Sequence, residues 1–183
     1  MAADKTNLSS TMTVAQYNVL ADKGDRHELA RFVRQRFEER YFRPINSTPA
    51  TDKHGFTIMA VCCLLIETLE SFYQGRADTK GKSRKMFSDF FERDTALKVF
   101  GGGNAWFYCD IRCGILHQSE ARNGWHIVRS GPLIDHSKKR INATRFIREL
   151  RKSVDIYAQL IEDDDVVWSH FKKKMQAVCG NCT

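Results

Sequence analysis

Arg112 and His117 lie five residues apart in the stretch Arg-Cys-Gly-Ile-Leu-His, and their side-chain types suit chemistry on a phosphate. A histidine exchanges protons near neutral pH, and an arginine binds phosphoryl oxygens bidentately and stabilises the charge that builds on them. In the alternative interpretation, Arg112 forms a surface ion pair and His117 is a satisfied core or helix-end histidine. The two residue types alone leave both interpretations open.

The spacing of this pair places it on two faces of a helix. At about 100° per residue, five positions separate Arg112 from His117 by about 140°, so one helix cannot easily bring both side chains onto one small group. A two-fold axis between two copies would place each residue opposite its partner's equivalents. Gly114, between them, allows a backbone to approach closely, either from a second chain or within one chain. The spacing therefore favours a composite site shared by two chains.

Cysteine and histidine side chains offer other chemistries. Cys113 and His117, four residues apart, could form a thiolate and base couple, but no third orienting group accompanies them. The Cys179–Cys182 pair has C-x-x-C spacing without a second pair of ligands, so we interpret it as part of a tail rather than as a redox or zinc site. The remaining metal candidates have no recognised ligand spacing; they are Cys113, His117, His126 and His136. We expect neither a metal nor a cofactor.

The elements that must position the motif are helices. Apolar residues recur with a helical period around the motif from Asn104 to Gln118. A β-branched run at 126–128, a turn at Ser130 and Gly131, and a second apolar run predict a short hairpin. The other predicted helices cover residues 26–42, ending before Pro44, then 56–74, 83–94 with Ser83 as N-cap, and 142–161 with a continuation past residue 163. The predicted fold class is all-α, a helical bundle of about five helices with one short β-hairpin after the motif helix.

A chain of 183 residues fits one domain. Residues 1–25 are polar and aperiodic, so we expect them to be flexible or weakly ordered, followed by a single helical domain over 26–176 and a C-terminal tail over 177–183. No apolar run reaches the roughly 20 residues that cross a bilayer, and the first residues lack a signal-peptide pattern. We expect a cytoplasmic protein with no membrane partner.

The stretch RCGILHQ, within FYCDIRCGILHQSE, resembles the motif of the HEPN superfamily, in which four to six residues separate an arginine from a histidine. The helix ending LIETLESFYQG and the predicted hairpin are also similar to those of prokaryotic HEPN-type proteins of unassigned role, so the resemblance covers about residues 55–165. It implies a helical domain that dimerises so that two motifs line one cleft. Active members are metal-independent ribonucleases, often toxins or anti-phage effectors, that leave a cyclic phosphate. They often have a polar residue directly after the arginine, where this chain has Cys113.

On this resemblance, Arg112 would bind the scissile phosphate, and His117 would transfer protons as an RNA 2′-hydroxyl attacks its own phosphate. One alternative is a non-catalytic HEPN module that dimerises and binds a nucleotide or a partner such as a cognate antitoxin. Another is a helical interaction protein whose basic face binds RNA or DNA without cutting it.

The charge of the chain also favours an anionic partner, since 29 Lys and Arg against 22 Asp and Glu give a net charge of +7. The stretch Lys138–Lys152 holds seven basic residues against one acidic residue, and Gly75–Lys85 holds five against one. Both could instead be ordinary solvated surface. We expect RNA backbone to contact the first stretch, predicted as a basic helix, through Lys138, Lys139, Arg140, Arg145 and Arg148.

Overall fold

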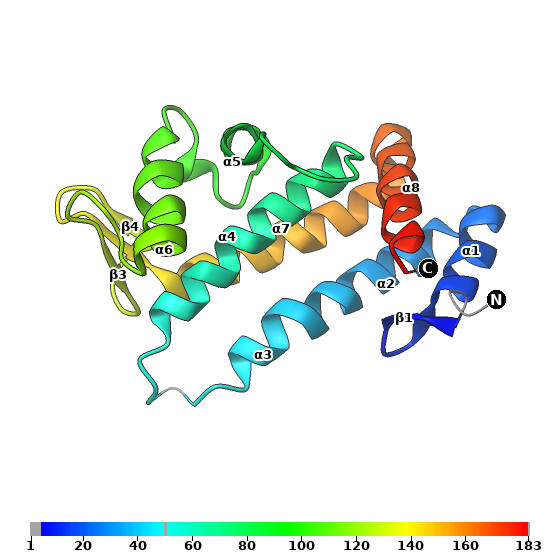
Figure 1. Ribbon diagram of the computed structural model, residues 1–183, viewed down its shortest axis with the longest axis horizontal. Coiled ribbons are helices and arrows are strands. Elements are labelled where there is room, and N and C mark those ends of the chain that lie inside the picture. Colours follow the sequence, from blue (N-terminus) through cyan, green and yellow to red (C-terminus); the bar gives the residue numbers. More distant parts are fainter. Residues whose placement is uncertain (1–4, 50, 183) are drawn as a thin grey trace. The chain divides into compact units, whose positions relative to one another are not determined.

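The computed structural model describes residues 5–49 and 51–182, and these residues are mostly helical with two small sheets (Figure 1). The helical character predicted from the apolar period is confirmed. In chain order the elements are β1 (Asn7–Ser9), β2 (Met12–Thr13), α1 (Val14–Lys23), α2 (Arg26–Phe37), the π-helix η2 (Glu38–Phe42), α3 (Arg43–Asn46), α4 (Gly55–Tyr73), α5 (Ser83–Arg93), the 3₁₀-helix η3 (Lys98–Phe100), the π-helix η4 (Phe107–Arg112), α6 (Cys113–Gln118), β3 (His126–Val128), β4 (Ile134–Asp135), β5 (Arg140–Asn142), α7 (Ala143–Asp163) and α8 (Asp165–Gly180).

The chain folds into two compact units. Unit 1 comprises the residues up to Pro44, Ser71–Thr79 and the residues from Val154 onward, and unit 2 comprises Ile45–Glu70 and Lys80–Ser153. Helices α4 and α7 contribute residues to both units. The boundary expected near residue 25 does not separate the two units, whereas the motif and the basic stretch up to Ser153 both belong to unit 2.

Aromatic side chains form the core of unit 2. Phe91 of α5 packs against Phe107 of η4 and against Phe100 of η3, with ring centroids 5.0 Å and 5.4 Å apart. Phe146 of α7 lies 5.1 Å from Phe100 and 5.5 Å from Phe107. The apolar stripe predicted on residues 83–94 is confirmed, because Met86, Phe87, Phe90 and Phe91 are all buried. This cluster fixes the motif helix against α5 and the start of α7.

Two tryptophans stack beside this core. The rings of Trp106 and Trp125 lie 4.2 Å apart and nearly parallel, at 11°. His136 meets both rings edge-on, at 5.7 Å and 5.9 Å. Because Trp106 directly precedes η4 and Trp125 directly precedes β3, the stack ties the motif helix to the sheet.

The sheet of unit 2 differs from the predicted hairpin. Its strand order is β3-β5-β4, with β3 parallel and β4 antiparallel to β5. The two apolar runs therefore form strands as expected, but they lie on either side of β5 instead of pairing with each other. Their partner, Arg140–Asn142, lies in the basic stretch that was predicted to be helical. The predicted pairing of the two runs is wrong because the ladder hydrogen bonds go to this third segment.

The N-terminal segment of unit 1 is ordered rather than flexible. Strands β1 and β2 pair antiparallel, and Thr13 and Gln16 form a reciprocal capping box that starts α1. Tyr17 of α1 is 4% exposed and packs its ring 6.3 Å from Phe32 of α2 and 6.2 Å from Phe171 of α8. The expectation of a loose segment over 1–25 is therefore corrected for residues 7–23, since burial of these apolar side chains stabilises it.

Several predicted helix ends also move. The first helical run continues through Pro44, because α3 starts at Arg43 and a proline is tolerated in the first turn of a helix. The last predicted helix does not continue past residue 163. Asp164 interrupts it, and its carboxylate caps α8 by accepting hydrogen bonds from Val166 N and Val167 N. Helix α8 then extends to Gly180, into the expected tail.

Helix α4 is the one helix within residues 5–49 and 51–182 that is long and apolar enough to cross a membrane by length and composition alone. In the structure, 61% of its apolar window is buried inside the protein. The core helix of a soluble protein has the same properties, so this finding by itself does not assign α4 to a membrane.

Candidate functional site

The motif lies where a π-helix passes into an α-helix. Residues 107–112 form the π-helix η4, and Cys113–Gln118 continue it as α6. π-Helical turns are rare, and they occur frequently at functional sites. Arg112 is the last residue of η4 and His117 lies in the last turn of α6, so the α-helical turn between them keeps their side chains on different faces.

Arg112 lies against a carboxylate of α4. Its Nη2 atom is 3.6 Å from Oε2 of Glu67, and its guanidinium lies 5.4 Å from the ring centre of Tyr108. Glu67 is itself positioned by Ser83, whose hydroxyl donates a hydrogen bond of 2.6 Å to Oε1. The predicted N-cap role of Ser83 is thus replaced, since Lys82 occupies the cap position of α5.

The contact between Arg112 and Glu67 is an ion pair that is too long for a hydrogen bond. No residue in the described part of the chain accepts a hydrogen bond from the Arg112 guanidinium. The side chain is 20% exposed, and that of Glu67 is 18% exposed. Arg112 therefore keeps its donors for an anion, although the neighbouring carboxylate offsets part of its charge.

His117 is exposed, and none of residues 5–49 and 51–182 provides a hydrogen-bond partner for its ring. Within one chain the structure does not bring the His117 ring and the Arg112 guanidinium together. A site that uses both side chains would need Arg112 of one chain and His117 of a second copy of the chain.

Two exposed leucines flank the Arg112–Glu67 pair. Leu116 follows Arg112 by one helical turn and is 59% exposed, and Leu64 precedes Glu67 by one turn on α4 and is 63% exposed. Residues three or four positions apart share one face of a helix. The ion pair is therefore bordered on both helices by apolar side chains that are open to solvent.

Gly114 is required by a close approach within the chain. A Cβ atom at this position would collide with the carbonyl oxygen of Glu120 and would lie 3.2 Å from Cγ of Arg122. The loop after α6 folds back over the motif helix, where Arg122 N donates to the Asp110 carbonyl oxygen at 2.9 Å and Asn123 Nδ2 donates to the Asp110 carboxylate at 2.8 Å. Of the two approaches expected for Gly114, the structure contains the intramolecular one.

The five basic residues predicted to contact RNA are all exposed, but they do not form one helix. Lys138 and Lys139 lie in a turn, and Arg140 belongs to β5. Helix α7 starts only at Ala143, so the predicted helical stretch from residue 138 is corrected. Arg145 and Arg148 lie three residues apart on α7 and share its exposed face.

A cavity of about 470 Å³ in unit 2 was missed by the sequence analysis. Its walls come from residues 51–56 at the start of α4, from β3 and from Glu120. Sequence patterns could not identify it, because its walls come from segments about 70 residues apart in a turn-rich loop and a three-residue strand. The sequence feature that could have indicated the cavity is the presence of the basic residues Lys53, His126 and Arg129 in these segments, and all three line the cavity.

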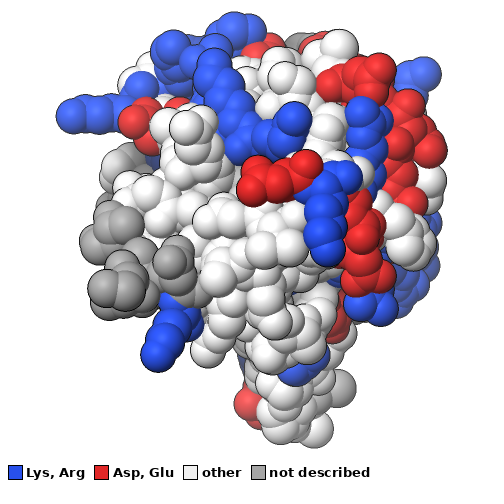
Figure 2. Space-filling model, turned by 90° about the vertical axis from the view of Figure 1, so that its right-hand side faces the viewer, with Lys and Arg blue, Asp and Glu red and all other residues white. Residues whose placement is uncertain are grey.

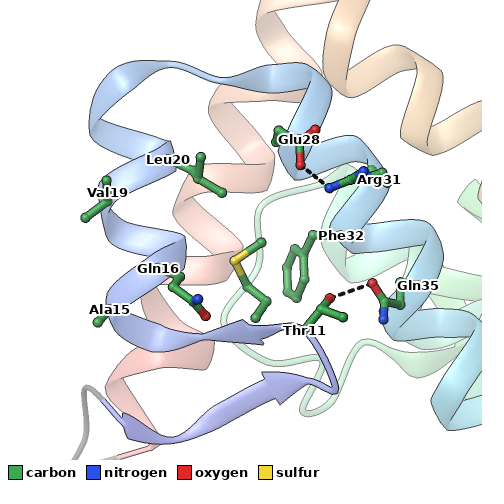
Figure 3. Close-up of a pocket in the computed structure, with 10 residues that line it drawn as sticks. Thr11, Ala15, Gln16, Val19, Leu20, Glu28, Arg31, Phe32 and Gln35 are labelled. Atoms are coloured by element: carbon green, nitrogen blue, oxygen red, sulfur yellow. Dashed lines mark hydrogen bonds and ion pairs between the residues drawn. The ribbon is translucent and has the colours of Figure 1, made fainter.

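A second cavity, of about 480 Å³, lies in unit 1 (Figure 3). Val19 and Leu20 of α1 and Phe32 of α2 give it an apolar wall. Its edges are closed by the hydrogen bond from Thr11 to Gln35 at 2.7 Å and by the Glu28–Arg31 ion pair at 2.5 Å. None of the predicted site residues lines this cavity.

The charged side chains of unit 1 do not form a patch of one sign on the face that carries α1 and α8. Figure 2 shows basic and acidic side chains next to one another across the top and along the right of this face, and an uncharged area below them.

The thiol chemistries considered for this chain find little support in the geometry. Burial raises the pKa of Cys63 to about 12, which keeps this thiol protonated. Burial and the neighbouring Cys113 thiol raise the pKa of the Tyr108 hydroxyl. Burial also raises the pKa of Cys179. Within residues 5–49 and 51–182, no group of three or more His, Cys, Asp or Glu side chains is arranged to hold a metal ion.

Comparison with known proteins gives no relative: no family model, no curated protein and no solved structure matches the chain. The geometry of the residues must therefore carry the functional argument.

Proposed function

We propose that this protein is a HEPN-like, metal-independent endoribonuclease that acts as a homodimer, with Arg112 of one chain and His117 of the other in each composite site. The observation that carries the proposal is the state of the two side chains. Arg112 has unused hydrogen-bond donors and His117 is exposed, although the two lie on different faces of the same motif helix.

The dimer part of the proposal is supported by the exposed leucines beside the motif. Leu64 and Leu116 expose apolar surface to water in the monomer. Burying this surface against a second copy would stabilise a dimer. An isologous interface around Arg112 brings the same residues of both chains to one axis.

In the proposed reaction the 2′-hydroxyl of one nucleotide attacks the adjacent phosphorus. The bond to the 5′-oxygen of the next nucleotide breaks, so the products are a 2′,3′-cyclic phosphate and a 5′-hydroxyl. His117 takes the proton of the attacking hydroxyl or protonates the leaving oxygen, and Arg112 stabilises the charge on the phosphoryl oxygens. The five exposed basic residues hold the flanking RNA, with an affinity that falls as salt rises.

A non-catalytic HEPN-like module that binds RNA, a nucleotide or a protein partner is the second candidate. The observation that favours it is Glu67, whose carboxylate lies 3.6 Å from the Arg112 guanidinium and competes with a phosphate for it. Cys113, in place of a polar residue directly after the arginine, points the same way. A cytoplasmic toxin or phage-defence role, with a cognate antitoxin or defence partner, fits either candidate.

The test is cleavage of labelled single-stranded RNA in EDTA by the purified protein, beside R112A and H117A. Two matched variants, R31A and H27A, remove exposed residues of the same types in unit 1, whereas the motif lies in unit 2. Loss of cleavage in the first two variants with retention in the matched pair would support the enzyme. Equal cleavage by all five proteins would indicate contamination and would refute it.

The dimer is tested by sedimentation at micromolar concentration, where the species should have about twice the monomer mass of 21.1 kDa. The double substitution of Leu64 and Leu116 by serine should shift the equilibrium to monomer. A wild-type protein that stays monomeric while cleaving RNA would refute the composite site.

A further inference from the structure

The cavity of unit 2 has the size and the side chains of a nucleotide site. Its volume of about 470 Å³ lies within the ~300–1,000 Å³ range of small-ligand pockets. The half-buried ring of Phe56 forms part of its wall, and Lys53 and His126 form another part. Proteins recognise unpaired nucleotides by stacking the base on an aromatic ring and binding the phosphate with cationic groups.

Two of the three basic residues that line this cavity, Lys53 and His126, are available to a ligand. Neither Lys53 nor His126 forms an ion pair with any residue in the 5–49 and 51–182 ranges. The third basic residue, Arg129, is held in place by the Asp52 carbonyl oxygen at 2.6 Å and by the Thr144 hydroxyl at 3.5 Å. These contacts orient the guanidinium, and two acidic residues, Asp52 and Glu120, line the same cavity.

The backbone at Gly55 makes room for this arginine. A Cβ atom at Gly55 would lie 3.1 Å from Cγ and 3.5 Å from Cδ of Arg129. The Arg129 side chain therefore lies directly against the first residue of α4. The loop before α4 and strand β3 are joined through this side chain, which gives the cavity two connected walls.

The cavity is close to the motif along the chain. Glu120, which lines the cavity, follows His117 by three residues, and three residues span at most about 10 Å. The cavity also borders the basic residues of the sheet, because His126 is the register partner of Arg140 and its amide donates to the Lys139 carbonyl oxygen at 2.8 Å. His117, the cavity and Arg140 therefore lie near enough to one another for one single strand of RNA to contact all three.

We propose that this cavity binds one nucleotide of single-stranded RNA next to the cleaved phosphate, with the base stacked on Phe56 and a phosphate held by Lys53, His126 and Arg129. The proposal rests on the proposed function for the choice of RNA as the ligand and for the position beside the cleaved phosphate. The Phe56 ring favours a nucleotide, because every base has a π-face that can stack on it.

The experiment measures binding without cleavage. A fluorescein-labelled, eight-nucleotide RNA with 2′-O-methyl groups at every position cannot undergo attack by a 2′-oxygen, so its anisotropy reports affinity alone. The variants are F56L, which keeps apolar bulk but removes the ring, and K53E. The matched control K98E makes the same charge change at an exposed lysine outside the cavity. Circular dichroism and thermal melting establish that each variant is folded.

F56L and K53E should each weaken binding on the order of tenfold, and K53E should reduce the slope of log affinity against log salt by about 0.7. K98E should change binding less than twofold. Binding by wild type that is equal in F56L, K53E and K98E would overturn the proposal, as would a wild type that binds an acidic peptide but not this RNA.

The two proposals fail separately. A wild type that never cuts unmodified RNA but binds the methylated RNA through Phe56 and Lys53 would refute the ribonuclease and support the cavity. A wild type that cuts RNA through Arg112 and His117, with affinity unchanged in F56L and K53E, would support the ribonuclease and overturn the cavity.

Discussion

The substitution G114A tests the fold of the motif most directly. In an open helix, replacing glycine by alanine stabilises a protein by about 1 kcal/mol. At Gly114 the new methyl group would collide with the Glu120 carbonyl oxygen, which belongs to the backbone and cannot rotate away. The loop after α6 must then move, and its two hydrogen bonds to Asp110 would be lost.

The magnitude follows from these terms. Two hydrogen bonds contribute about 1 kcal/mol each, and overpacking adds about 1 kcal/mol or more. After subtraction of the helix-propensity gain, G114A should lower the free energy of unfolding by about 2 kcal/mol. For a chain of this length the melting temperature should fall by about 4–8 °C.

The assay is thermal and urea unfolding of G114A beside G180A, which adds the same methyl group at a helical glycine with open space around it. G180A should be neutral or slightly stabilising. If G114A is as stable as wild type, the contact between the loop and the motif helix does not control this position. If instead only its dimer dissociation changes, with monomer stability intact, Gly114 acts between two chains.

Three other predictions concern unit 2. Burial raises the pKa of Asp94, so the wild-type protein gains stability from protonation of this carboxylate as pH falls. D94N should therefore melt at a higher temperature than wild type at neutral pH, and the difference should shrink as the pH is lowered. A difference in melting temperature that does not depend on pH would contradict this. Phe146 is fully buried, so F146A should lower the free energy of unfolding, measured by urea titration, by about 3–5 kcal/mol. A loss below about 1 kcal/mol would mean that the aromatic cluster is loosely packed. E67Q keeps an acceptor for the Ser83 hydroxyl but removes the negative charge beside Arg112. It should therefore tighten binding of the methylated RNA several-fold at low salt and less at high salt. Unchanged affinity at all salt concentrations would show that RNA does not reach Arg112.

The parts of the fold that sequence predicted are the long amphipathic helices. Phe87, Phe90 and Phe91 repeat at a helical period over a full element, and their burial followed from that period alone. The N-terminal segment was not predicted because β1 and β2 have only three and two residues, and α1 buries only Val14 and Tyr17. The Tyr17 ring packs against Phe32 and Phe171, and Phe171 lies far along the chain.

The sequence indicated which residues form the candidate site, but not which residues surround them. The Arg112–Glu67 pair joins residues 45 positions apart, and no local pattern indicates it. The role of Gly114 depends on how the loop after α6 folds back, and the cavity depends on Arg129 meeting Gly55. Contacts of this kind arise from tertiary packing, which a single sequence does not encode in its spacing.

The stacked tryptophans give unit 2 a built-in optical label. Trp106 and Trp125 belong to unit 2, whereas Trp168, the third tryptophan of the chain, belongs to unit 1. Because Trp125 directly precedes His126 in the cavity wall, the fluorescence of the pair can be read during a titration with unlabelled RNA. In W168F this emission comes from unit 2 alone, so occupancy of the cavity and melting of the motif unit can be followed without attaching a dye to either molecule.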